Sequence, residues 1–257
     1  MAAASRSLTR FLPQTSPVTY GILAVCSALY VVSFLATMNR SGFAAPGGGF
    51  GAIFGLGGID GSILFRMGAS VPLAVSPNDV TQPWRLVTAI FLHGGLLHIG
   101  FNMWVLMDVG PILEELYGSA RYFFIFVVTG IFGYVASSVT GHFSVGASGS
   151  LLGLVGVLLA LTSGRQNPGM RMLRSQLLYW LVYIAVIGFV MRGTVDNFAH
   201  AGGFAAGFLL GKVMSDRPPA DASERGRAQA LGWAAGLAVG ASFTFMLLNY
   251  FLSGPGA

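Results

Sequence analysis

Residues 146–164 read GASGSLLGLVGVLLALTSG, a small polar beginning followed by an apolar run. A run of this length is typical of a helix that spans a membrane. Ser148 would therefore lie at the surface of a bilayer or just inside it. Glycine recurs along the run at Gly149, Gly153 and Gly156, and such a stripe of small residues allows two helices to approach closely.

A second apolar run, residues 198–213, carries a matching stripe. Gly203, Gly207 and Gly211 recur in it every four residues, and His200 lies near its start. If the two stripes face each other, a serine and a histidine meet inside the membrane.

The composition excludes a soluble globular domain, because 54% of the 257 residues are hydrophobic and only 9% are charged. We therefore predict an all-α polytopic membrane protein. The net charge of +5 does not indicate a nucleic-acid partner, because the arginines are spread along the chain at the ends of apolar runs. The partner that this composition predicts is the lipid bilayer.

Seven apolar runs are candidate spans, at residues 17–38, 86–107, 122–139, 148–164, 177–191, 198–213 and 231–252. The first lacks a small-residue cleavage site, so we expect it to remain in the protein as a span. With the N-terminus in the cytoplasm, ten Lys and Arg residues fall inside and four outside, as the positive-inside rule requires. Residues 39–83 would be an interfacial connection that ends with Trp84 and Arg85 at the headgroups.

Ser148 and His200 are the candidate catalytic residues. A serine hydroxyl becomes a useful nucleophile when a base takes its proton, and the pKa of histidine suits that task near neutral pH. The alternative is that Ser148 is a packing residue that caps its helix and that His200 is a histidine of the helix bundle.

His98 and Asn102 favour the catalytic interpretation. They are four residues apart, so on a helix they share a face, and both can donate hydrogen bonds to an oxygen anion. His93 is as consistent with a structural role as with a site role, and His142 is expected in an exposed loop. No acidic or cysteine ligand lies near these histidines at metal-site spacing, so we expect neither a metal nor a cofactor.

Taken together, these residues resemble the rhomboid intramembrane serine proteases. The resemblance runs from about residue 68 to residue 211. Its motifs are Trp84-Arg85, His98-xxx-Asn102, Gly110-xxx-Glu114-xxx-Gly118, Gly146-Ala147-Ser148-Gly149, and Ala199-His200-Ala201-Gly202-Gly203-xxx-Gly207.

The resemblance implies an intramembrane serine endopeptidase that cleaves the transmembrane segments of membrane proteins. It makes Ser148 the nucleophile and His200 the general base, with an oxyanion site formed by His98, Asn102 and the Ser148 backbone. Its substrates would be proteins with a single transmembrane helix, and residues 188–194 with the span before them would form the substrate gate. Relatives carry an aromatic residue one turn after the nucleophile, where this chain has Leu152.

The resemblance also implies a domain organisation, namely a rhomboid-like six-helix bundle with one additional C-terminal transmembrane helix. Residues 1–16 would be a cytoplasmic segment, 17–215 the six-span core, 216–228 a cytoplasmic linker and 229–252 the seventh helix. We expect the protein in the plasma (inner) membrane of a bacterium. The sequence carries no signal for an oligomeric state.

Two other classes of function remain to be compared with this one. A catalytically inactive rhomboid-like protein would bind transmembrane helices, but such relatives lack the serine or the histidine, and this chain has both. A transporter would show internal repeats with paired broken helices, and none is evident.

We expect two acidic residues, Glu114 and Asp196, to have structural rather than catalytic roles. Glu114 should form hydrogen bonds to the backbone or to Arg121, at the end of the protein opposite the chemistry. Asp196 precedes His200 by one turn, which suggests a triad, but at the start of a span it is better suited to cap the helix.

Overall fold

The computed structural model describes residues 16–41, 58–72, 82–163, 165, 167–191, 193–217 and 219–252. Within these ranges the regular elements are helices, and a single antiparallel bridge joins Ser70 to Ser144. The helices are α2 (Pro17–Ser41), α4 (Gly61–Arg66), α5 (Arg85–Thr88), α6 (Leu96–Tyr117), α7 (Ser119–Val139), α8 (Ser148–Thr162), α9 (Pro168–Val190), α10 (Asn197–Val213) and α11 (Ala222–Leu252).

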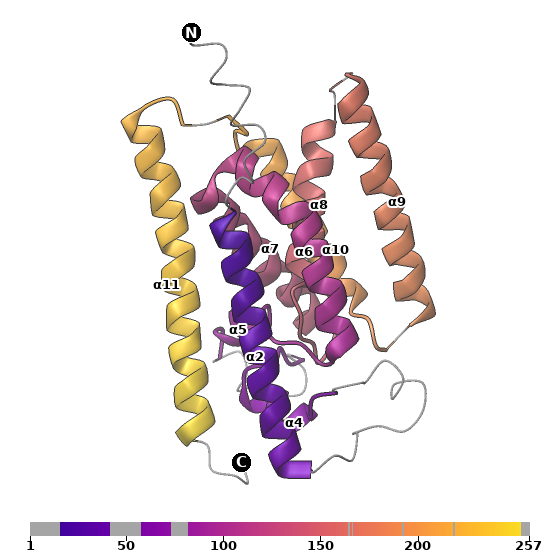
Figure 1. Ribbon diagram of the computed structural model, residues 1–257, viewed down its shortest axis with the longest axis vertical. Helices are drawn as coiled ribbons and strands as arrows, with labels where there is room; N and C mark the ends of the chain where they lie inside the picture. Colours follow the sequence, from indigo (N-terminus) through magenta and orange to yellow (C-terminus); the bar gives the residue numbers. More distant parts are fainter. Residues whose placement is uncertain are drawn as a thin grey trace.

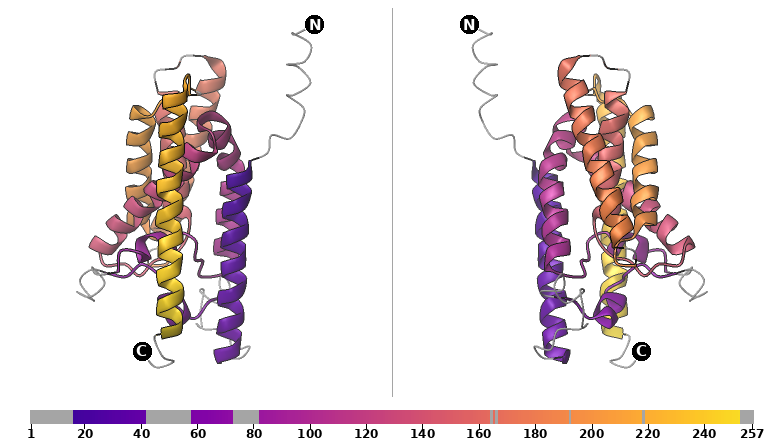
Figure 2. Two further views of the ribbon diagram at one scale, coloured as in Figure 1. Left: turned by 90° about the vertical axis from the view of Figure 1, so that its left-hand side faces the viewer. Right: turned by 90° about the vertical axis from the view of Figure 1, so that its right-hand side faces the viewer.

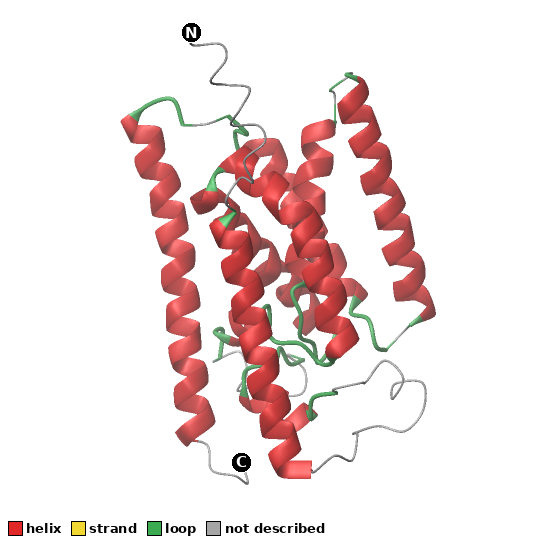
Figure 3. Cartoon of the chain, viewed as in Figure 1, coloured by secondary structure: helices red, strands yellow, loops and turns green. Residues whose placement is uncertain are grey.

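The long helices run roughly along the longest axis, and the short α4 lies near the lower end of the bundle (Figure 1). Helices α2 and α11 begin at the same end and finish at the other, as a second view shows (Figure 2). The described chain is helical throughout its regular parts (Figure 3). The prediction of an all-α polytopic membrane protein with a further C-terminal helix is confirmed.

Five helices, α2, α6, α7, α9 and α11, are long and apolar enough to cross a bilayer, whereas α8 and α10 are shorter, with 15 and 17 residues. A helix of 15 residues rises about 22 Å, less than the roughly 30 Å of a hydrocarbon core. One end of α8 must therefore lie inside that core. The far end of α8 is followed by polar residues that include Arg165, so the recessed end is the one that begins at Ser148. We call this side of the bundle the Ser148 end.

The closest contact in the bundle joins α8 to α10. A Cβ atom added at Gly203 or at Gly207 would overlap the backbone of Gly149 or Gly153, respectively. One turn further on, a Cβ at Gly211 would lie 2.8 Å from the carbonyl oxygen of Val157. Both helices advance by four residues between contacts, so they run parallel and begin at the same end. The prediction that the two glycine stripes face each other is confirmed.

The predicted second span is displaced. The sequence placed it at residues 86–107, but α6 begins at Leu96 and continues to Tyr117, through Pro111. Residues 85–95 form the short α5 and a buried turn that contains Gly94 and Gly95. An apolar run cannot distinguish a spanning helix from buried irregular backbone, and the two glycines favour the turn. Similarly, α11 begins at Ala222, so the second half of the predicted linker is helical.

Trp84 and Arg85 are buried inside the protein. The side chain of Arg85 is only 3% exposed. Its Nη1 donates to the carbonyl oxygen of Phe65 at 2.6 Å and to that of Ala69 at 3.2 Å. The pair therefore holds residues 58–72, which we call the α4 loop, against the start of α5.

Glu114 lies on α6 and caps the start of α2. Its carboxylate accepts hydrogen bonds from the backbone N–H groups of Val18 and Thr19, at 3.0 and 2.9 Å, and from the hydroxyls of Thr19 and Ser119. Helix-start N–H groups lack intrahelical partners, so the expected bonds to backbone are confirmed. Of the two alternatives, the backbone is the partner that the structure shows, and Arg121 binds elsewhere.

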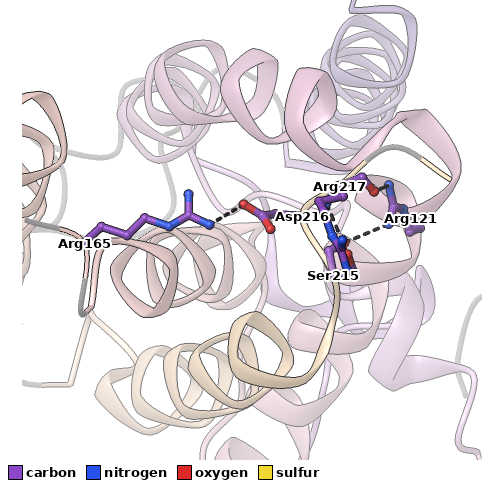
Figure 4. A network of polar contacts seen from close by, with 5 residues as sticks. All are labelled: Arg121, Arg165, Ser215, Asp216 and Arg217. Atoms are coloured by element: carbon purple, nitrogen blue, oxygen red, sulfur yellow. Dashed lines mark hydrogen bonds and ion pairs between the residues drawn. The ribbon is translucent and has the colours of Figure 1, made fainter. Parts of the chain in front are cut away.

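Arg121 instead donates to the carbonyl oxygens of Ser215 and Arg217, which joins the start of α7 to the chain after α10 (Figure 4). Beside it, Arg165 forms an ion pair with Asp216 at 2.6 Å. That hydrogen bond lowers the pKa of the Asp216 carboxyl below its ordinary value. These contacts connect the loops at the end opposite Ser148.

The contact between α8 and α10 predicts the effect of a side chain at Gly203. Gly203→Val should destabilise the protein by at least about 2 kcal/mol, because the branched side chain would have to displace the Gly149 backbone. Thermal unfolding in detergent measures this. Gly240→Val on α11 is the matched control, since a Cβ there meets nothing within 4 Å. Unfolding of Gly203→Val at the wild-type midpoint would contradict the contact.

The cap on α2 predicts that Glu114→Gln lowers stability. The glutamine amide keeps one acceptor oxygen, but its NH2 group would face a backbone N–H that now donates to Glu114. We therefore expect the free energy of unfolding to fall by about 2 to 3 kcal/mol. Asp108→Asn, an exposed change on the same helix, should shift the unfolding midpoint very little. A Glu114→Gln protein with wild-type stability and abolished activity would instead assign Glu114 to the chemistry.

Candidate active site

The turn before α8 has a conformation that requires glycine. Gly146 has φ +127°, and a Cβ added there would lie 2.6 Å from Nε2 of His98. The N–H of Gly146 donates to the carbonyl oxygen of Ala89 at 2.9 Å, and its own carbonyl accepts from the Tyr134 hydroxyl at 2.7 Å. Both backbone groups of Gly146 are therefore fixed two residues before Ser148.

His98 and Asn102 lie in the first two turns of α6 and approach this same turn. The backbone N–H of Gly94 donates to Nδ1 of His98 at 3.4 Å, so in a neutral ring the proton is on Nε2, which faces Gly146. Asn102 is buried, and its Nδ2 has no hydrogen-bond partner within the described part of the chain. That nitrogen lies 3.5 Å from the position of a Gly146 Cβ. Two N–H donors thus converge on the turn that precedes Ser148.

Ser148 is the first residue of α8 and is half-buried. A helix start leaves backbone N–H groups without intrahelical partners and has a positive end of the dipole. The side-chain donors of α6 and the backbone donors of α8 therefore lie on the same side of the bundle. Together they can stabilise a negative charge that develops on an oxygen.

His200 lies in the first turn of α10, at the same end of the bundle. The carbonyl oxygen of the preceding residue, Ala199, would lie 3.3 Å from a Cβ at Gly149 and 2.8 Å from one at Gly133. The start of α10 is thus packed against the first turn of α8 and against α7. Nδ1 of His200 is buried and has no hydrogen-bond partner among the residues that the structure describes.

Asp196 is the N-cap of α10. Its Oδ1 accepts from the backbone N–H groups of Phe198 and Ala199 at 3.1 and 3.0 Å, and its Oδ2 accepts from the hydroxyl of Ser137. The expected capping role is confirmed.

The two remaining histidines differ in their surroundings. His93 lies in the buried turn before α6, is 1% exposed, and packs edge-on against His98 with ring centroids 5.2 Å apart. His142 was expected to be exposed but is half-buried, because its ring packs against Phe198 at 5.2 Å. Within the described ranges no three His, Cys, Asp or Glu side chains are grouped so that they could hold a metal ion.

Sequence reasoning missed the contribution of α7. Tyr134 fixes the Gly146 turn, Gly133 makes room for Ala199, and Ser137 binds Asp196. The only signal was the run of small residues Gly130, Gly133 and Ser137 within an otherwise apolar helix. Such a run is common in membrane helices, so it does not by itself indicate a site.

Comparison with known proteins identifies the family to which this chain belongs. The family model described as the Rhomboid domain matches residues 80–217, which is 138 of the 257 residues. The chain belongs to the rhomboid family. The matched region of this rhomboid contains α5 to α10 and all the candidate site residues, whereas α2 and α11 lie outside it.

Similar proteins come from distant organisms. RHOMBOID-like protein 5 of Arabidopsis thaliana is 40% identical over 143 residues, which are 53% of this chain and 46% of that protein. Rhomboid protease GluP of Bacillus subtilis is 36% identical over 132 residues, or 51% of this chain and 26% of that protein. Rhomboid-like protease 1 of Toxoplasma gondii is 29% identical over 167 residues, or 61% of this chain and 56% of that protein. The family therefore includes proteases, and this chain spans between about a quarter and just over half of these relatives.

The bond from Tyr134 to the Gly146 turn predicts a loss of stability on its removal. Tyr134→Phe leaves the buried carbonyl oxygen of Gly146 without its donor, so we expect destabilisation of about 1 to 3 kcal/mol. Tyr179→Phe is the matched control, because Tyr179 is 78% exposed on α9. Equal unfolding midpoints for the two variants would show that the Tyr134 bond does not hold the turn.

Proposed function

We propose that this rhomboid is an intramembrane serine endopeptidase that cleaves the transmembrane segments of other membrane proteins. The observation that carries the proposal is the parallel, glycine-mediated contact between α8 and α10. It puts the first turns of the two helices, with Ser148 and His200, side by side at one end of the bundle.

In the proposed reaction, the Ser148 hydroxyl attacks the carbonyl carbon of a peptide bond and gives its proton to His200. The carbonyl oxygen gains a negative charge, which His98, Asn102 and the Ser148 backbone N–H stabilise. His200 returns the proton to the leaving amine as the peptide bond breaks. Water then attacks the acyl-enzyme with His200 again as base, which releases the acid and restores Ser148.

The proposed catalytic unit is a dyad rather than a triad. A third member would accept a hydrogen bond from Nδ1 of His200. Asp196 uses one carboxylate oxygen for the cap of α10 and the other for Ser137, and Nδ1 of His200 has no partner in the described structure.

The proposed substrates are proteins with a single transmembrane helix, which would enter between α6 and α9. Helix α9 packs mainly against α8 and leaves a groove of about 780 Å³ next to Trp104 and Trp180, whose rings are 5.3 Å apart. This groove supports the proposal that α9 and residues 188–194 form the gate; residue 192 lies outside the described residues.

The proposed location is the plasma (inner) membrane of a bacterium, with the N-terminus in the cytoplasm. The distribution of ten Lys and Arg residues in the segments assigned to the inside and four outside supports this orientation. The Ser148 end would then face away from the cytoplasm.

Labelling with a fluorophosphonate probe, followed by mapping of the labelled residue, tests the nucleophile. We expect label on Ser148, and none in Ser148→Ala. Label on another serine, or none under conditions in which a related active protein is labelled, would favour the alternative of an inactive rhomboid-like protein that binds transmembrane helices.

Turnover of a transmembrane substrate tests the dyad. Ser148→Ala, His200→Ala and the double variant should fall to a similar floor, because a nucleophile and its base act as one unit. Asp196→Asn should cost less than about tenfold, against the orders of magnitude expected for an orienting carboxylate. A folded Asp196→Asn protein at the Ser148→Ala floor would replace the dyad with a triad.

A further inference from the structure

The C-terminal end of α11 is joined to the α4 loop by a small group of polar contacts. Nη2 of Arg66 donates to the carbonyl oxygen of Tyr250 at 2.8 Å, and its guanidinium lies 4.6 Å from the centre of the Tyr250 ring. In return, Nδ2 of Asn249 donates to the carbonyl oxygen of Arg66 at 3.1 Å. We call this group, Arg66, Asn249 and Tyr250, the Arg66 clasp. It joins residues more than 180 positions apart in the sequence.

Apolar packing accompanies the clasp. Met246 of α11 is 4% exposed and belongs to a small cluster of its own, separate from the main core. The other members of the cluster come from the α4 loop and from the α5 region: Ile59, Ile63, Leu64, Met67, Ala69, Trp84 and Leu92. Helix α11 therefore covers one side of the α4 loop as well as anchoring it.

The α4 loop in turn contacts both halves of the candidate site through its backbone. At its start, the N–H of Ile59 donates to the carbonyl oxygen of Gly94 at 3.1 Å, and the N–H of Gly94 is the group that donates to His98. At its end, Ser70 and Ser144 exchange two backbone hydrogen bonds of 3.0 Å each. Ser144 is two residues before the Gly146 turn.

We propose that the Arg66 clasp positions the active site, so that α11 serves catalysis without contacting the substrate. A shift of the start of the α4 loop would move Gly94, whose N–H donates to Nδ1 of His98. A shift of its end would move Ser144, which precedes the turn before Ser148. Arg66 is thus a positioning residue that acts through the α4 loop. This inference rests on the proposed protease function. It assigns a role to α11, the predicted seventh transmembrane helix, which lies outside the matched family region.

The test measures the rate, and separately the final extent, of fluorophosphonate labelling at Ser148, together with kcat and KM for a transmembrane substrate. Arg66→Ala should reduce the labelling rate and kcat in parallel, by about tenfold, with little change in KM, because small misplacements of reacting groups are costly. The final extent of labelling counts the competent molecules. A purely structural role would lower that extent or the unfolding midpoint but leave the rate per competent molecule unchanged.

Three further variants sharpen the test. Arg66→Lys keeps a cation and a donor, so its rate should lie between those of wild type and Arg66→Ala. Asn249→Ala removes one hydrogen bond and should cause a smaller loss, and it serves where Arg66→Ala does not fold. Tyr250→Phe keeps the ring and the backbone carbonyl, so it should label at the wild-type rate.

Wild-type labelling rates in both Arg66→Ala and Asn249→Ala would overturn the inference, even if their stability fell. Hydrogen exchange at the Ser70 and Ser144 amides tests the linkage without catalysis: exchange should be faster in Arg66→Ala, and unchanged exchange would also overturn it. Failure of the proposed function has a different signature, because wild-type protein would then not be labelled at Ser148.

Discussion

The architecture depends on the backbone contact between α8 and α10. Gly203 lies against the backbone of Gly149, and Gly207 against that of Gly153, at separations that leave no room for a Cβ atom. In a bilayer, lipid tails are as apolar as leucine side chains, so helices associate through close packing rather than through a hydrophobic driving force. The glycines supply that packing. They also fix the register, because a slide of either helix would bring side chains against the backbone.

The short length of α8 has a second consequence. Because α8 cannot span the hydrocarbon core, the chain before Ser148 is irregular backbone at membrane depth. Such backbone is tolerated only where protein satisfies its polar groups. Tyr134 supplies a hydroxyl to the Gly146 carbonyl, Arg85 supplies a guanidinium to two carbonyls of the α4 loop, and Ser70 pairs with Ser144. The structural residues of this rhomboid therefore gather around the irregular segments.

The polar groups at the two ends of the bundle have different surroundings. At the end opposite Ser148, Glu114 caps α2 and Arg121 holds the chain after α10. At the Ser148 end, buried polar atoms of Asn102 and His200 have no partner among the described residues. Burial of an unsatisfied polar group costs free energy, and a substrate bound at the candidate site could supply partners for these two atoms.

The sequence by itself determined the class of the protein, the two glycine stripes and the candidate residues Ser148, His200, His98 and Asn102. These follow from local chemistry: a lipid-exposed apolar run must satisfy its backbone as a helix, small residues permit contact, and a nucleophile needs a base. Only the tertiary structure decided that α6 begins at Leu96, that Glu114 caps α2, that α7 packs against the candidate site, and that α11 contacts the α4 loop. The reason is physical. The same apolar sequence can form a spanning helix or a buried turn, so the sequence does not distinguish them. A contact such as that of Arg66 with Tyr250 joins segments far apart in the chain, and no local pattern predicts it.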